Sequence, residues 1–334
     1  MSGRGVAAAL LATAAVALAA CSGEADSKEP ADRAGRAALE GCGPLAYDDV
    51  AGRAPEYVDG PLAAVPNDHA MCAGRWLPRT GTRFVPQGLV VRGHTAWVSG
   101  YDAGRNAVGS DTCRIIRLDL RTGERISQVA RISADPAPRG PANCRHAGGL
   151  SMDEHGLWVS QFTKVWLLDP HTFEVLRVWH LIDQVRGSFL VHDDRGRLGV
   201  GGFHGDRRWP LHWFDADVLF EPGRLDLTPE LAADAQPAPR AGQGALWADL
   251  GPGPAQVWFT RSNTYCGELW AGPQRRFAFL PGAEGVAFAR GRVWVVSETT
   301  AAPYFLDGGR PVVPTLAQYD VSDFPRWERS DCGA

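Results

Sequence analysis

The sequence predicts an all-β fold, a β-propeller of five four-stranded blades, from three observations. The chain of 334 residues contains 39 Gly and 24 Pro and only short apolar runs, which favours short strands joined by turns over helices. A strand–turn–strand pattern recurs five times, and in three of the copies a Gly is followed nine residues later by a Trp. In four of five copies the next strand ends in an apolar residue and Asp. Four antiparallel strands repeated five times are typical of a propeller, in which each blade packs against its neighbours.

The first two strands of each blade are expected where this pattern recurs. The five copies span residues 86–101, 148–162, 188–203, 244–260 and 283–298. The second strand carries Trp97, Trp158, Trp258 or Trp294 in four copies, and Gly199 in the third. We expect these Trp side chains to fill space between blades and not to form a stacking platform for bases or sugars.

Third and fourth strands follow most copies. Third strands are expected within 115–124, 165–174, 211–216, 268–273 and 316–321. Fourth strands are expected within 125–131, 174–181 and 275–280. The fifth copy has no clear fourth strand, and residues 72–84 are expected to supply it and close the ring, which removes the free sheet edges. A ring of six blades is the alternative, if residues 131–145 or 219–241 contain further strands.

The amino terminus has the layout of an export signal. Residues 1–20 contain an apolar, Ala-rich run that is too short for a convincing membrane span and leads into "LAAC", where the Cys is Cys21. These four residues resemble a bacterial lipobox, whose Cys becomes acylated and N-terminal; a plain secretory signal is the alternative. Residues 21–45 are polar and are expected to be a flexible tether, and residues 46–334 a single propeller domain that includes the closing segment. The protein is therefore expected to be lipid-anchored in the cell membrane, facing outside the cytoplasm.

The cysteine content agrees with export. Six Cys remain after Cys21, an even number that suggests three disulfides formed outside the cytoplasm. They are Cys42, Cys72, Cys113, Cys144, Cys266 and Cys332. Cys113 starts the third strand of the first blade and Cys144 lies in the connection to the next blade, at the same face of the ring, so we expect these two to pair. A zinc site is disfavoured because no CxxC or CxxH pair exists.

Polar residues are expected to meet at one opening of the central channel. The first strand of a blade lines the channel and the second runs back beside it, so the start of the first and the end of the second share one face. The candidate ligand-binding residues at these positions are Gln87, Asp102, His146, His204, Gln243, Asn263, Glu284 and Glu298. Polar groups that converge on a concave opening are the default hypothesis for a site. The alternative is that loop ends are polar in any soluble propeller.

Glu284 and Glu298 are the leading pair, because both belong to one blade and stand at adjacent strand ends. With His146 or His204 they would hold a divalent cation such as calcium through oxygen and imidazole ligands. The same pair would equally serve as a general acid and base. Residues 206–208, Asp-Arg-Arg, are a candidate anion-binding loop, for which an ordinary solvated Arg pair is the alternative.

Across residues 72–330 the blade pattern resembles the superfamily of gluconolactonase-like secreted propellers. This resemblance implies a propeller fold and, as in members with lactonase activity, a divalent metal held by a Glu and several Asn or Asp around the channel. Glu284, in "AEGVAF", would correspond to that Glu, and Asn263 to one Asn. Gln87 and Gln243 stand where a charged or Asn ligand is expected, which departs from the pattern.

A second resemblance is to an enzyme family, so three functions are possible. The phrase "FVPQGLV" (84–90) is similar to the first-blade phrase of plant-type glutaminyl cyclases, which are five-bladed. One function is a lipid-anchored propeller that binds a small molecule or a protein at the channel opening, without catalysis. Another is a metal-dependent lactonase or ester hydrolase. The third is a glutaminyl-cyclase-like enzyme.

Charge and motifs narrow the function classes. The formal net charge is −4, so no electrostatic attraction favours nucleic acid. No nucleophile elbow, phosphate loop or HExxH motif is present, and no local pattern proposes a Ser-His-Asp arrangement. We expect a monomer that contacts the membrane through its lipid and binds one ligand at the channel.

Overall fold

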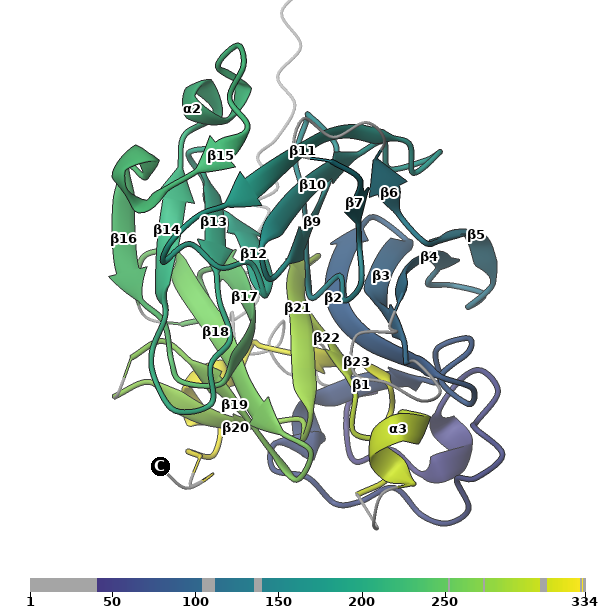
Figure 1. Cartoon of the computed structure of the whole chain (residues 1–334). Helices are drawn as coiled ribbons and strands as arrows, with labels where there is room; N and C mark the ends of the chain where they lie inside the picture. Colours follow the sequence, from purple (N-terminus) through teal and green to yellow (C-terminus); the bar gives the residue numbers. More distant parts are fainter. Residues whose placement is uncertain are drawn as a thin grey trace, which may run out of the picture.

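The structure, a computed structural model, describes residues 41–103, 112–134, 140–251, 253–272, 274–306, 311–330 and 332. Five sheets, each built on four antiparallel strands, lie around a common centre (Figure 1). This arrangement is a five-bladed β-propeller, so the predicted fold class is confirmed.

Each blade runs from an inner strand at the centre of the ring to a fourth strand at its outer edge. Blade 1 consists of β2 (Phe84–Arg92), β3 (Thr95–Asp102), β4 (Thr112–Asp119) and β5 (Arg125–Ala130). Blade 2 consists of β8 (Gly149–Met152), β9 (Leu157–Gln161), β10 (Lys164–Leu168) and β11 (Val175–Leu181). Blade 3 consists of β12 (Phe189–His192), β13 (Leu198–Gly201), β14 (Pro210–Phe214) and β16 (Asp234–Pro237). Blade 4 consists of β17 (Gly242–Ala248), β18 (Gln256–Asn263), β19 (Cys266–Trp270) and β20 (Arg276–Phe279). Blade 5 consists of β21 (Ala283–Ala289), β22 (Arg292–Ser297), β23 (Leu316–Asp320) and β1 (Met71–Arg75).

The ring closes by pairing the first strand of the chain with the last. β1 lies antiparallel to β23, with Arg75 opposite Leu316 and Met71 opposite Tyr319. The segment expected to complete the fifth blade therefore does so, starting one residue earlier than the predicted range. The inner strands β2, β8, β12, β17 and β21 contact one another in this order, and β21 contacts β2.

The two long connections contain further strands but no sixth blade. In the first, β6 (Ser133–Ala134) and β7 (Ala142–Asn143) form a separate two-stranded sheet. In the second, β16 completes blade 3, and β15 (Asp226–Leu227) lies parallel to β11 at the outer edge of blade 2. Within the described residues the six-bladed alternative is therefore wrong.

Short helices lie in the connections between strands. They are η1 (Tyr47–Asp49), η2 (Asp68–Ala70), α2 (Ala216–Phe220), η3 (Pro229–Leu231), α3 (Ala302–Phe305) and η4 (Phe324–Arg326). None of the helices in the part of the chain that the structure describes is long and apolar enough to cross a membrane.

The Trp residues of the second strands belong to the core. Those of blades 1, 2 and 4 are buried and that of blade 5 is partly buried: Trp97, Trp158, Trp258 and Trp294. In blade 3 a Cβ atom added to Gly199 would lie 3.0 Å from Cζ3 of Trp213, on β14. Trp213 thus fills the space that a second-strand Trp fills elsewhere. The expectation that these side chains pack within the ring is confirmed.

Glycines bring the backbones of the inner strands into contact at the axis. Blades 1, 2, 4 and 5 have Gly at the equivalent position, and blade 3 has Phe: Gly88, Gly149, Gly244 and Gly285, with Phe189 in blade 3. A Cβ added to Gly285 would lie 2.5 Å from the carbonyl oxygen of Gln87, and one added to Gly149 would lie 2.6 Å from Cα of Phe189. Only Gly permits such close approach. The channel is narrow at this level, so residues before and after it lie at opposite openings.

Three disulfides bind parts of the domain together: Cys42–Cys72, Cys113–Cys144 and Cys266–Cys332. The pair expected from the sequence, Cys113 and Cys144, has its Cα atoms 5.4 Å apart. Cys42 belongs to the segment assigned to the tether, and its bond to Cys72 ties the end of that segment to β1. The expected signal peptide, Cys21 and the tether up to residue 40 lie outside the described residues.

Candidate functional site

Three inner strands carry a β-bulge just before they reach the axis. The pairing register shifts within β2, β17 and β21, and the polar residue in each shifted stretch is Gln87, Gln243 or Glu284, respectively. A bulge bends its strand and redirects a side chain. The same local feature, a β-bulge, therefore directs three of the polar side chains expected at the start of first strands toward the opening.

Glu284 and Glu298, which directly follows β22, are buried together with 2% and 6% of their surface exposed. Their carboxyl groups are hydrogen-bonded to each other. Burial, the charge of Glu298 and the hydrogen bond donated to it raise the pKa of Glu284 well above its usual range. Burial also raises the pKa of Glu298 to about 7, although hydrogen bonds from Gln87, Tyr304 and Glu284 lower it. At neutral pH Glu284 therefore stays protonated and donates to Glu298, which itself titrates near neutrality.

Gln87 connects the carboxylate pair to the surface. Its Nε2 atom donates to Oε2 of Glu298 at 2.8 Å, and its Oε1 atom lies 3.1 Å from Nε2 of His146. Because an amide oxygen only accepts, Nε2 of His146 carries the proton in this contact. The exposed imidazole of His146 also stacks on Tyr101, with ring centroids 4.2 Å apart. His146 therefore covers the path from solvent to Gln87.

Tyr304 links the other side of the pair to the same rim. It lies on α3, in the connection between β22 and β23, and its hydroxyl is hydrogen-bonded to Glu298. The hydroxyl oxygens of Tyr304 and Tyr101 are 3.0 Å apart. Burial and the nearby Glu298 charge raise the pKa of Tyr304, so its hydroxyl stays protonated and donates to the carboxylate. Glu298, Gln87, His146, Tyr101 and Tyr304 thus form a continuous ring of contacts.

One oxygen of the carboxylate pair has no N–H or hydroxyl donor. The Oε1 atom of Glu284 is buried and accepts no N–H or hydroxyl hydrogen bond from the described residues. A buried polar atom of this kind costs about 1–3 kcal/mol, and most such atoms in native proteins have a partner. The arrangement can therefore accept a hydrogen bond from a ligand, and it can also exchange a proton near neutral pH.

Two of the expected residues serve local structure. Asp102 accepts hydrogen bonds of 2.9 and 3.1 Å from Nε of the buried Arg114. Asn263 accepts two backbone N–H groups, at 2.8 and 3.0 Å, and so closes the turn between β18 and β19. A third, Gln243, is half-buried and lines a small void at the axis. The structure thus places Glu284, Glu298, Gln87 and His146 in one contact network, while Asp102 and Asn263 have other partners.

His204 belongs to a loop that is held by its own contacts. Its Nδ1 atom accepts the backbone N–H groups of Asp206 and Arg207 at 3.0 and 3.3 Å, and its ring meets Trp209 edge-on. The Arg207 guanidinium lies 4.4 Å from the centre of the Trp209 ring. This Arg, one of the two expected to bind an anion, is therefore stacked on an aromatic face.

The two tyrosines of the ring were not singled out in the sequence. Tyr101 is adjacent to Asp102 at the end of a second strand, and extending that position by one residue would have found it. Tyr304 lies on a helix inserted in one blade only, so no repeat indicates it. Three further residues that the sequence did not reveal, Ser151, Asp153 and His192, meet at the opposite opening.

Comparison with known proteins finds distant structural similarity and no family. No family model matches the chain, and no curated protein matches it. A solved structure of a nidogen/laminin complex is similar over 64% of this chain and 73% of that chain, with 16% identity and a TM-score of 0.37. BamB from Moraxella catarrhalis is similar over 74% and 59%, with 10% identity and a TM-score of 0.30. A chain of the mitotic checkpoint complex is similar over 71% and 63%, with 11% identity and a TM-score of 0.32. The last two alignments span less than two thirds of the known chains.

Proposed function

We propose that this protein is a lipid-anchored, extracytoplasmic β-propeller that binds a small organic cation at the opening containing Glu284 and Glu298. The observation that carries the proposal is the buried Oε1 atom of Glu284, which accepts no N–H or hydroxyl hydrogen bond from the described residues. An N–H group of a ligand would supply the missing donor. The proton shared by the pair would leave as the cation enters, which would keep the buried charge balanced.

An ammonium or amidinium group suits the residues around the pair. Such a group offers several N–H donors, whereas an ionised carboxylate only accepts. Tyr101 and His146 stack at the rim of the site, and aromatic faces attract organic cations. Because His146 is exposed and contacts Gln87, it is the first member of the network that a ligand would meet.

A divalent metal, which the gluconolactonase-like resemblance implies, fits the same residues poorly. Calcium takes six to eight oxygen ligands. The Gln87 carbonyl oxygen already accepts from His146, and Asn263, the residue that would match a family ligand, holds two backbone N–H groups. The two carboxyl groups alone would leave most of a calcium coordination sphere to water.

The lipid anchor is proposed from the "LAAC" sequence that ends at Cys21. The three disulfides support a location outside the cytoplasm, where such bonds form and persist. Metabolic labelling with an alkyne fatty acid, followed by membrane fractionation, tests the anchor. Wild-type protein should be labelled and membrane-bound, and Cys21→Ser should lose both properties. A labelled Cys21→Ser protein would contradict the assignment.

Ligand binding is tested by thermal unfolding of the full-length protein in detergent. The panel consists of methylammonium, choline, arginine and spermidine as organic cations, with Ca²⁺ and Mg²⁺ as inorganic ones. A ligand at 100 times its Kd stabilises a folded protein by about 2.7 kcal/mol, which is readily seen as a higher Tm. At least one organic cation should raise Tm, and Glu284→Gln and Glu298→Gln should each abolish the rise.

The matched control is Glu124→Gln, which removes a carboxylate from an exposed turn of blade 1. It should leave the ligand-induced rise in Tm unchanged. Stabilisation by Ca²⁺ or Mg²⁺ alone, lost in both site variants, would favour the metal site instead. An equal response of the wild type and both site variants would show that the ligand binds elsewhere.

A further inference from the structure

The second opening of the channel lies beyond the glycine level, at the other end of the inner strands. It forms a depression lined by apolar and polar side chains, among them Arg92, Ser151, His192, Trp247 and Phe288. Gln87 precedes Gly88 on β2, whereas Arg92 ends the same strand, so this opening is on the opposite side of the ring from Glu284.

Two positions at this opening depart from the repeat. Ser151 occupies a position that is apolar in the four other blades: Val90, Val191, Leu246 and Ala287. His192 occupies the next position along, which is also apolar elsewhere: Val91, Met152, Trp247 and Phe288. The two polar residues are on the inner strands of adjacent blades, β8 and β12. Two apolar side chains of the repeat are thus replaced by polar ones, and the side chains of Ser151 and His192 contact each other.

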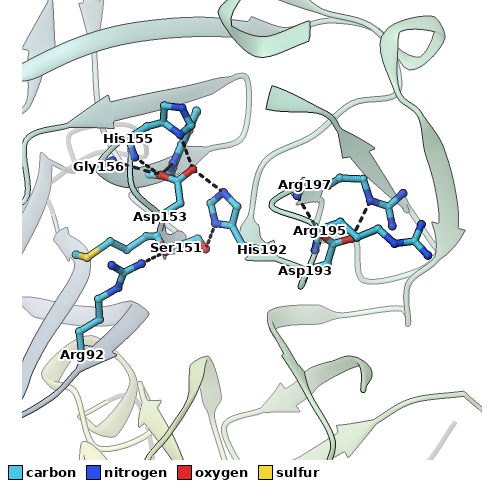
Figure 2. Close-up of polar contacts among 11 residues, drawn as sticks. Arg92, Ser151, Asp153, His155, Gly156, His192, Asp193, Arg195 and Arg197 are labelled. Carbon is cyan, nitrogen blue, oxygen red and sulfur yellow. Dashed lines mark hydrogen bonds and ion pairs between the residues drawn. The ribbon is translucent and has the colours of Figure 1, made fainter. Parts of the chain in front are cut away.

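The side chains form a relay of one hydrogen bond and one ion-pair contact (Figure 2). Oγ of Ser151 lies 2.6 Å from Nδ1 of His192, and Nε2 of His192 lies 3.4 Å from Oδ2 of Asp153. An ionised carboxylate only accepts, so the imidazole proton is on Nε2. Nδ1 then accepts the Ser151 hydroxyl proton. This tautomer is the one in which a histidine acts as a general base toward a serine.

Asp153 is fixed as the charged end of the relay. Its Oδ1 atom accepts Nε1 of Trp158 at 2.7 Å and the backbone N–H groups of His155 and Gly156 at 3.0 and 3.2 Å. Burial alone would raise the pKa of Asp153, but the hydrogen bonds from His192, His155 and Trp158 hold it below its usual range. The carboxylate therefore stays ionised and orients the His192 ring.

We propose that Ser151, His192 and Asp153 form a nucleophilic site that hydrolyses carboxylic esters at this second opening. The proposal is independent of ligand binding at Glu284, because the two sites lie at opposite ends of the channel. Trp247 and Phe288 give the opening apolar walls, which suit an ester with a short apolar acyl chain. Arg92, which also lines it and donates to the Met152 carbonyl at 2.6 Å, supplies positive charge beside Ser151.

The reaction balances with water as the only co-reactant. Ser151 Oγ attacks the carbonyl carbon while its proton moves to Nδ1 of His192. The bond to the alcohol oxygen breaks, the alcohol leaves with the proton from Nδ1, and an acyl ester remains on Ser151. Water then attacks this ester and gives a proton to His192, which returns it to Ser151 Oγ as the carboxylic acid leaves. Arg92 is the group available to stabilise negative charge on the carbonyl oxygen in both steps.

The experiment treats full-length protein with an alkyl fluorophosphonate, which reacts with activated serines, and locates the adduct by peptide mass spectrometry. Hydrolysis of p-nitrophenyl butyrate is measured in parallel. The wild type should be labelled at Ser151, and Ser151→Ala should lose both the adduct and the hydrolysis. His192→Ala should slow hydrolysis by about 10²- to 10⁴-fold, the usual contribution of a general base.

The matched control is Ser160→Ala, on the next strand of the same blade, which removes a buried hydroxyl that has no hydrogen-bond partner among the described residues. It should be labelled and active at wild-type level. Labelling of wild-type protein needs no variant to fold, so it decides the question even if Ser151→Ala is unstable. Absence of an adduct on Ser151, or equal hydrolysis by the wild type and a folded Ser151→Ala protein, would overturn the proposal.

Discussion

Glu284 donates a hydrogen bond to Glu298 within blade 5, and the two buried carboxyl groups share a proton near neutral pH. Blade 5 is also where the ring closes, because β1 from the start of the domain pairs with β23. The charge state of this pair is therefore connected with the stability of the blade that completes the propeller.

Stability should fall as the pH rises through neutrality. Burial raises the pKa of Glu298 from the usual 4.5 to about 7, so the folded protein holds this proton more tightly than the unfolded chain. The resulting stabilisation is complete below about pH 4.5 and is lost as the pH rises through about 7, with a slope of up to about 1.4 kcal/mol per pH unit. Urea unfolding at pH 5, 6, 7 and 8 measures this, and Glu298→Gln should lose the component. Parallel curves for the two proteins would show that Glu298 does not titrate in this range.

Tyr304→Phe should move this titration to higher pH. The Tyr304 hydroxyl hydrogen-bonds the charged form of Glu298 and lowers its pKa, so its removal should raise that pKa further. The midpoint of the pH-dependent change in stability is the measurement. Tyr47→Phe is the control, since the Tyr47 hydroxyl donates to the backbone carbonyl of Val58. A shift of equal size in both variants would assign the effect to general destabilisation.

The Cys113–Cys144 disulfide should make a large contribution to stability. Its cysteines are 31 positions apart in the sequence, a loop for which chain-entropy arguments give about 3–4 kcal/mol. Replacing both cysteines by Ser should lower the free energy of unfolding by about that amount. Non-reducing peptide mapping of the wild type should recover the linked pair. Recovery of either cysteine bonded to a different partner would contradict the strand positions around it.

Glu268 should be essential for the stability of blade 4. It is fully buried, and it accepts hydrogen bonds from Arg261, Arg276 and Ser330 at 2.9, 2.7 and 2.7 Å. Glu268→Gln would remove the carboxylate that both Arg261 and Arg276 contact, and removing one partner of a buried ion pair typically costs about 3–5 kcal/mol. Glu221→Gln, in an exposed pair, is the control and should cost at most about 1 kcal/mol. Similar losses in both variants would contradict this view of Glu268.

Much of the fold can be predicted from the sequence because each blade repeats one local pattern. The Gly-to-Trp spacing locates first and second strands, and it places Glu284 and Glu298 at adjacent strand ends. The fourth strand of blade 3 is the exception. β16 follows a long connection that contains α2 and η3, and its sequence, "DAQP", has no alternating apolar pattern. Its position depends on pairing with β14, a contact that no local signal encodes.

The contacts that make a site were less accessible to sequence analysis. Tyr304 reaches Glu298 from a helix that one blade alone contains. Ser151 and His192 are separated by 41 positions and meet because β8 and β12 pack side by side. Both residues become noticeable only when the five blades are aligned, because each occupies a position that is apolar in the other four blades. Local motifs cannot reveal such a pair, because its geometry is set by the angle between neighbouring blades.

The glycine contacts at the axis also fix the number of blades. Gly88, Gly149, Gly244 and Gly285 hold the inner strands so close that an added Cβ would meet the backbone of the next blade. Duplication of one blade within the gene would widen the ring and pull these backbones apart. The hole left along the axis would be bordered by residues with no side chain to fill it. A six-bladed ring would therefore pack as closely at its axis only if larger residues replaced most of these glycines.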